Sequence, residues 1–158
     1  MSNANPSSKD EGNELAAIYQ LGNVKLSAAY ERLKYRNDDS TLGKINQYTR
    51  DAWYATAQPR FGAHRMWVLY GQARKGSCSI VGGDSCSTSG LGAKEYALGY
   101  AYDFSKRTAF FAQFYGVKNE ASASYGVFPS VPPGAAGNGG TAVGADTRAI
   151  GVGIQHLF

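Results

Sequence analysis

Apolar and polar residues alternate along most of this 158-residue chain, and no other feature restricts its fold so strongly. The clearest stretch is KEYALGYAYDF, at residues 94–104. Every second residue in it is aromatic or apolar: Tyr96, Leu98, Tyr100, Tyr102 and Phe104. Successive side chains of a β-strand point to opposite faces, whereas a helix needs a period near 3.6 residues. The pattern therefore predicts an all-β chain.

The connections between the predicted strands alternate between short and long. Tight turns are predicted at Gly22-Asn23, Gly62-Ala63 and Ser105-Lys106. The other connections are long loops rich in Asn, Asp, Ser, Gly and Pro, at about 36–49, 74–92 and 118–145. Seven strands result, at residues 14–21, 24–35, 50–61, 64–73, 93–104, 107–117 and 146–158. This alternation favours an antiparallel, up-and-down sheet whose two rims face different surroundings.

The composition is compatible with such a sheet in a membrane. No apolar run approaches the roughly 18 residues of a transmembrane helix, and only 18% of the residues are charged. Alternating barrel strands average to a neutral hydropathy, and a closed barrel pairs every backbone polar group within the bilayer. We expect residues 1–158 to form a single transmembrane β-barrel segment. Because such single-chain barrels have even strand numbers, seven strands predict part of a longer barrel, with residues 1–13 as an external loop remnant.

The two faces of the predicted strands differ in chemistry. Large side chains recur near the short turns, as in the aromatic girdle of a membrane barrel. The candidates for the membrane-facing girdle are Tyr19, Tyr30, Phe61, Tyr70, Tyr96, Tyr100, Tyr102, Phe104, Phe110 and Phe114. The pore-lining candidates on the other, polar face are Lys25, Glu31, Arg60, Arg65, Glu95, Asp103, Gln113 and Tyr115. Trp67 and Leu69 do not fit, because they fall on the polar face if Met66 and Val68 face lipid.

Few residues in the sequence are arranged for covalent or metal chemistry. Cys78 and Cys86 lie in a Ser- and Gly-rich loop, which suits a small disulfide, with two free thiols as the alternative. No metal site or cofactor is expected, because His64 and His156 lie in other segments. The serines near the cysteines lack a supporting His and Asp pattern, so an enzyme is the weakest class. The net charge of +4 comes from scattered Lys and Arg, so no nucleic-acid partner is expected.

Three segments resemble the C-terminal part of the Gram-negative general porins, in their β-proteobacterial (neisserial and Burkholderia-like) branch. These segments are residues 53–75, 97–119 and 151–158, and the YDFSKRT turn and the terminal GxxHxF pattern are the most specific parts. The resemblance implies a sixteen-stranded, trimeric barrel in the outer membrane, of which these would be the last seven strands. It also implies a signal for the outer-membrane barrel assembly machinery, at Ile150, Val152, Ile154, His156 and Phe158.

The function implied by this resemblance is passive diffusion of ions and small hydrophilic solutes through a water-filled channel. Outer-membrane lipid and lipopolysaccharide are the expected surroundings, and the homotrimer is the expected assembly. The constriction loop of the family would lie outside this chain. Pro59 departs from the family pattern, since an aromatic residue is usual there. Two alternatives remain open from the residues: a small, adhesin-like outer-membrane barrel without a channel, and a soluble β-sandwich binding module.

Overall fold

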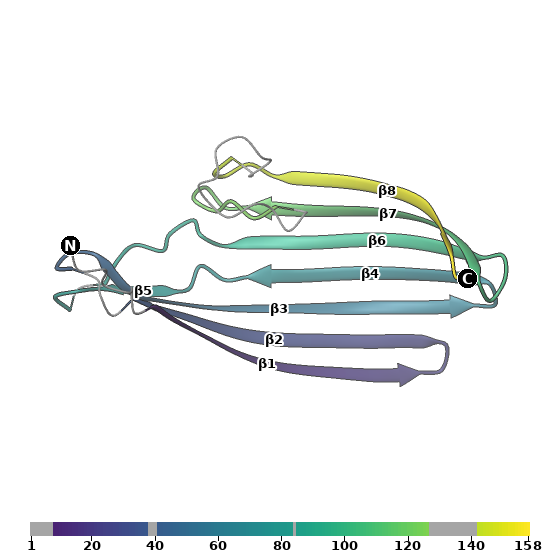
Figure 1. Cartoon of the computed structure of the whole chain (residues 1–158), viewed down its shortest axis with the longest axis horizontal. Coiled ribbons are helices and arrows are strands. Elements are labelled where there is room, and N and C mark those ends of the chain that lie inside the picture. The colour runs from purple at the N-terminus through teal and green to yellow at the C-terminus, as the bar shows by residue number, and fades with distance from the viewer. Residues whose placement is uncertain (1–7, 38–40, 84, 127–141) are drawn as a thin grey trace.

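The described residues of the computed structural model form one antiparallel sheet (Figure 1). The structure describes residues 8–37, 41–83, 85–126 and 142–158. The strands are β1 (Ser8–Leu21), β2 (Val24–Asn37), β3 (Ile45–Phe61), β4 (His64–Ala73), β5 (Ser77–Ile80), β6 (Ala93–Asp103), β7 (Thr108–Asn119) and β8 (Thr147–His156). Their order in the sheet is β1-β2-β3-β4-β6-β7-β8, and β5 pairs with β3 outside this path. The prediction of an all-β, up-and-down antiparallel fold is confirmed, and the sheet is not closed among the described strands.

The β-sandwich alternative is wrong, because the described strands belong to one sheet and not to two packed sheets. No helix long and apolar enough to cross a membrane occurs in the part of the chain that the structure describes.

Several strand boundaries differ from the prediction. β1 begins at Ser8 and not at residue 14, so much of the predicted loop remnant at residues 1–13 is strand, and residues 1–7 lie outside the described part. β3 likewise begins at Ile45 and not at residue 50. These extensions carry polar residues on both faces, so they lack the alternation that marks a strand with one apolar face. Backbone pairing continues there nonetheless, as between Ser8 and Asn37.

The remaining differences concern the loops. The short strand β5 lies inside the predicted loop at 74–92 and was missed, because four residues of a Ser- and Gly-rich segment show no periodicity. β8 ends at His156, two residues before the predicted end at 158. Much of the predicted loop at 118–145 falls in residues 127–141, which lie outside the described part.

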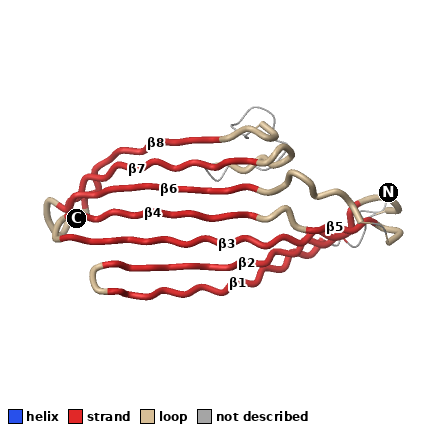
Figure 2. Tube along the Cα trace, turned by 180° about the vertical axis from the view of Figure 1, so that it is seen from behind, coloured by secondary structure: helices blue, strands red, loops and turns tan. Residues whose placement is uncertain are grey.

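The two rims of the sheet differ as the connection lengths predict. The β1–β2 and β3–β4 connections are two-residue turns, and Gly22 and Gly62 adopt φ angles of 57° and 59°, which favour glycine. These turns, the β6–β7 turn at 104–107 and the C-terminus lie at one end of the strands, which we call the short-turn rim (Figures 1 and 2). The longer connections lie at the opposite end, the long-loop rim.

Burial separates the two faces of the sheet. Small apolar residues are buried on one face, including Ala101 (2% exposed) and Val117 (4%). Large apolar residues are exposed on the other, including Leu98 (58%) and Ile150 (80%). We call the first the inner face and the second the outer face. Large apolar side chains exposed along several neighbouring strands are uncommon on soluble monomers.

The register of β4 resolves the facing of Trp67 and Leu69. Val68 pairs directly with Leu98 of β6, so Val68 lies on the outer face. Trp67 pairs with Gly99 and Leu69 with Ala97, both on the inner face, because directly opposed residues share one face of a sheet.

Candidate functional site

The polar inner face is the candidate functional site, because the register places all the pore-lining candidates on it. Lys25 lies opposite Gln58, Glu31 opposite Ala52, and Arg60 opposite Arg65. The pairs in the second half of the sheet are Gly71 with Glu95, Ala97 with Tyr115, Gly99 with Gln113, and Asp103 with Ala109. The sheet therefore collects polar and charged side chains from five strands, β2, β3, β4, β6 and β7, on one surface.

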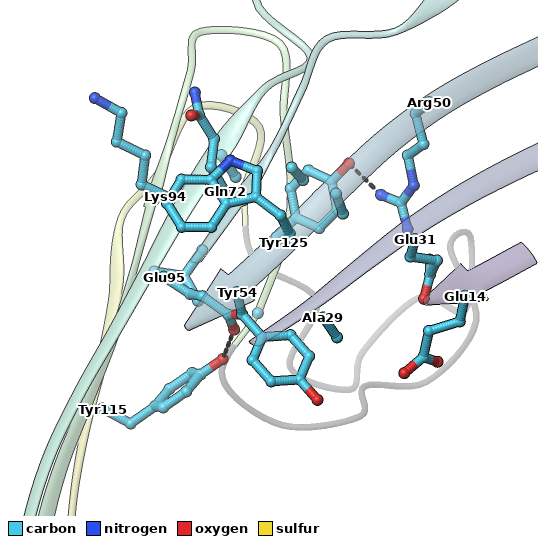
Figure 3. Close-up of a pocket in the computed structure, with 16 residues that line it drawn as sticks. Glu14, Ala29, Glu31, Arg50, Tyr54, Gln72, Lys94, Glu95, Tyr115 and Tyr125 are labelled. Carbon is cyan, nitrogen blue, oxygen red and sulfur yellow. Dashed lines mark hydrogen bonds between the residues drawn. The ribbon is translucent and has the colours of Figure 1, made fainter. Parts of the chain in front are cut away.

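A cavity of about 250 Å³ lies on the inner face toward the long-loop rim (Figure 3). Among its lining residues are Glu31, Glu95 and Tyr115, which were predicted as pore-lining. The Tyr115 hydroxyl donates a hydrogen bond of 2.5 Å to Oε2 of Glu95. The Glu95 side chain lies across Gly71 of β4, where any Cβ atom would meet the carboxylate. This contact holds the Glu95 carboxylate against the sheet.

Arg50 and Tyr125 also line this cavity, and neither was among the predicted site residues. Nη1 of Arg50 donates a hydrogen bond to the Tyr125 hydroxyl, and the guanidinium carbon lies 5.2 Å from the centre of the tyrosine ring. Arg50 is on β3 and Tyr125 follows β7, so 75 positions separate them. Arg50 stands at the predicted start of its strand, and Tyr125 lies in a predicted loop. No local sequence signal could have joined them.

An ion cluster lies on the inner face at the short-turn rim. Oδ2 of Asp103 is 2.9 Å from Nη2 of Arg60, and its Oδ1 is 2.7 Å from Nη2 of Arg65. Nε of Arg65 also donates a hydrogen bond of 3.0 Å to Oδ1 of Asp103, so two nitrogens of this guanidinium bind the carboxylate. Two guanidinium groups share one carboxylate, which leaves the cluster with a net positive charge.

The inner-face charges are distributed unevenly along the strands. Toward the long-loop rim the strand positions of this face carry four carboxylates, of Asp10, Glu14, Glu31 and Glu95, and one guanidinium, of Arg50. Toward the short-turn rim it carries three cations and one carboxylate: Lys25, Arg60, Arg65 and Asp103. An ion moving along the strands would therefore meet opposite fields in the two halves of this surface.

The outer face carries the aromatic candidates. All of the predicted girdle residues except Phe104 occupy outer-face strand positions, and Phe104 follows β6 in the turn. Several of these rings touch their neighbours, as do Tyr96 and Phe114, whose centroids are 5.9 Å apart. The ring of Phe104 meets Tyr102 edge to face at 5.2 Å.

On the outer face, Lys and Arg side chains lie beyond the end of the apolar band that is nearest the long-loop rim. Four strands carry a Lys or Arg one or two outer-face positions beyond their last large apolar residue: Arg32, Lys94, Lys118 and Arg148. We call these four residues the basic belt. Only Arg32 has a carboxylate nearby, since its Nε is 3.9 Å from Asp51 Oδ1, and no salt bridge involves the other three among the described residues. Toward the short-turn rim the outer-face strand positions hold no Lys or Arg in the described strands.

The residues predicted as an assembly signal lie at the end of the sheet. Ile150, Val152 and Ile154 are exposed on the outer face of β8, which is the last strand. Nδ1 of His156 is 2.9 Å from the Thr108 hydroxyl, and the Phe158 ring meets the His156 ring at 4.8 Å. Their role in assembly remains a prediction.

The two cysteines lie at the long-loop rim. Cys78 belongs to β5 and pairs with Tyr48 of β3, and the structure joins it to Cys86 in a disulfide whose Cα atoms are 5.4 Å apart. The covalent link closes residues 78–86 into a small ring beside the edge of β3. Among residues 8–37, 41–83, 85–126 and 142–158, no group of three His, Cys, Asp or Glu could hold a metal ion.

The fold of this chain is shared with a protein of known structure. The solved structure of an anion-selective porin from Comamonas acidovorans is similar to this chain, with a TM-score of 0.72 and 21% sequence identity. The match covers 97% of this chain and 40% of that porin, so the chain spans about two fifths of its length. No curated protein matches the chain. The resemblance to the neisserial and Burkholderia-like branch remains a prediction. Because residues 2–122, more than half of the sequence, match the family model of the Gram-negative porins, the chain belongs to that family.

Proposed function

We propose that this chain forms part of the wall of an outer-membrane channel through which ions and small hydrophilic solutes diffuse passively. The observation that carries the proposal is the separation of the faces: an exposed apolar surface on one side and a charged polar surface on the other. Lipid would cover the outer face and water would fill the space before the inner face. Family membership and the fold also support an outer-membrane location.

The mechanism needs no covalent chemistry. Solutes would be selected by the width of the channel and by the field of the inner-face charges. The Comamonas protein is named as anion-selective, and the net positive cluster of Arg60, Arg65 and Asp103 supports the same preference at the short-turn rim here. Gram-negative porins are channel proteins and not enzymes, and no inner-face residue is proposed as a nucleophile or a base.

The expected partners follow from the same surfaces. The basic belt supports contact with the phosphate groups of lipopolysaccharide, because cations beside the apolar band would meet the headgroups of one leaflet only. The last strand supports recognition by the barrel assembly machinery. A homotrimer and a barrel of sixteen strands are proposed from the family resemblance.

Planar bilayers provide the test. The protein purified from outer membranes, in a folded form whose gel migration changes on heating, should insert in discrete steps, each adding a fixed conductance. A heat-denatured sample at the same detergent concentration serves as the control. The proposal is refuted if folded, heat-modifiable protein gives no conductance steps.

A further inference from the structure

The chain after β7 turns back onto the inner face, at residues 119–126, which we call the strap. Asn119 fixes its geometry. The side chain of Asn119 is buried, accepts a hydrogen bond from the Tyr125 backbone N–H at 2.9 Å, and donates to the Tyr125 carbonyl oxygen at 2.8 Å. The same side-chain nitrogen also donates to the Ala145 carbonyl oxygen at 2.7 Å. One buried amide therefore closes the strap at both ends and ties it to the chain entering β8.

The middle of the strap is bound to the neighbouring loop. The backbone N–H of Ser122 donates to the Gly90 carbonyl at 2.8 Å, and the N–H of Glu120 donates to the Gly92 carbonyl at 2.9 Å. Ala123, which lies between Ser122 and Tyr125 in the strap, is buried, with 2% of its surface exposed. Hydrogen bonds to a second segment and burial of this kind hold a loop in one conformation.

The far end of the strap reaches across the sheet. Tyr125 contacts Arg50 of β3, although β4 and β6 lie between β3 and β7. Neighbouring strands are about 4.8 Å apart, so the strap spans on the order of 14 Å of the inner face. Figure 3 shows Tyr125 and Arg50 facing one another beside the cavity, with Glu95 and Tyr115 on the other side.

Arg50 keeps its charge in this contact. Its partner is a neutral hydroxyl, and no salt bridge joins Arg50 to a carboxylate among the described residues, unlike Arg60 and Arg65, which share Asp103. Its Nε is buried and makes no hydrogen bond with the described residues. A partly buried cation whose charge is not paired attracts small anions more strongly than one on an open surface.

We propose that the strap narrows the channel at the long-loop rim, and that Tyr125 holds Arg50 there as a determinant of anion preference. This inference rests on the proposed channel function and extends it. The two residues have separable roles. Tyr125 narrows the opening, and Arg50 supplies the one guanidinium among the inner-face carboxylates of the described strands at this rim, so that entering anions meet a positive charge there.

Two sets of variants test these roles in the protein purified from outer membranes. Tyr125→Ala removes the ring that lines the cavity beside Arg50, and Tyr125→Phe removes only the hydrogen bond to Arg50. Tyr125→Ala should raise the single-channel conductance by about 1.2-fold or more, and Tyr125→Phe should increase current fluctuations in the open channel. Tyr70→Phe, on the outer face, is the matched control and should behave as the wild type.

Arg50→Gln and Arg50→Lys test the charge. Arg50→Gln should move the zero-current potential in a KCl gradient toward cation preference, whereas Arg50→Lys should largely keep the wild-type value. Gel migration before and after heating establishes that each variant is folded. If the wild type conducts and both Tyr125→Ala and Arg50→Gln match it in conductance and selectivity, the strap proposal is wrong and the channel proposal stands. If the folded wild type does not conduct, the channel proposal itself fails.

Discussion

The indole ring of Trp67 on β4 lies over Gly99 of β6, in the space that a Cβ atom at Gly99 would occupy. The ring of Phe111 covers Gly153 of β8 in the same way, and a Cβ atom there would lie 2.7 Å from it. These two inner-face rings therefore lie over the backbone of the neighbouring strand. Glycine on the neighbouring strand makes this possible, because it leaves the pleated surface open beside the backbone. The arrangement keeps space in front of the inner face.

Gly99→Ala should displace the Trp67 ring from the sheet. Overpacking a close contact costs about 1–3 kcal/mol, and the displaced indole would enter the space before the inner face. We expect a lower temperature for the heat-induced change in gel migration and a smaller single-channel conductance. Gly151→Ala is the control, because its nearest neighbour is the flexible side chain of Gln113 at 3.3 Å. A Gly99→Ala protein with unchanged conductance and heat stability would contradict this account of the ring.

Asp103→Asn should increase the preference for anions. The substitution removes the carboxylate that Arg60 and Arg65 share, so both guanidinium groups would present their full charge at the short-turn rim. We expect the anion-to-cation permeability ratio, measured from the zero-current potential, to rise by about 1.5-fold or more. Asp51→Asn changes the net charge equally on the outer face and should leave the ratio unchanged. Equal effects of the two substitutions would show that the ion cluster does not act on permeating ions.

Neutralising the basic belt should weaken binding to lipid phosphate. Each Lys or Arg near an anionic membrane surface contributes about 1 kcal/mol, so changing Lys94, Lys118 and Arg148 together to Gln should remove on the order of 3 kcal/mol. The measurement is the amount of lipopolysaccharide retained through purification, compared at low and high salt. Gln substitutions at Lys44, Lys75 and Lys106, which lie in connections, form the matched control. Equal lipid retention by both triple variants would refute the role of the belt.

Phe158→Ala should reduce the amount of protein in the outer membrane without changing its stability once assembled. The Phe158 side chain is fully exposed, and within the described part of the chain its ring meets the His156 ring, so it adds little to packing. Quantification in outer-membrane fractions measures assembly, and gel migration on heating measures stability. Leu157→Ala, one position away, is the control. A loss of heat stability in Phe158→Ala would mean that the ring acts through packing and not as an assembly signal.

The sequence alone was sufficient for the seven long strands, for their antiparallel order and for the division of residues between two faces. These properties depend on local alternation and on turn residues, such as Gly22 and Gly62, and neighbouring residues encode both. The same reasoning failed where alternation stops. The segments Ser8–Asn13 and Ile45–Thr49 pair as strands although most of their side chains are polar on both faces, and β5 is too short to show a period.

Only the tertiary structure decided which side chains meet. The sequence placed Arg60, Arg65 and Asp103 on one face, but the register brought both guanidinium groups onto one carboxylate. Trp67 was ambiguous until its pairing with Gly99 placed it on the inner face. The contact between Arg50 and Tyr125 depends on the path of a loop across two intervening strands. The alternating pattern of a strand determines to which face of the sheet each of its side chains points. Contacts between residues distant in sequence depend instead on strand register and on the path of the loops, which no local pattern specifies.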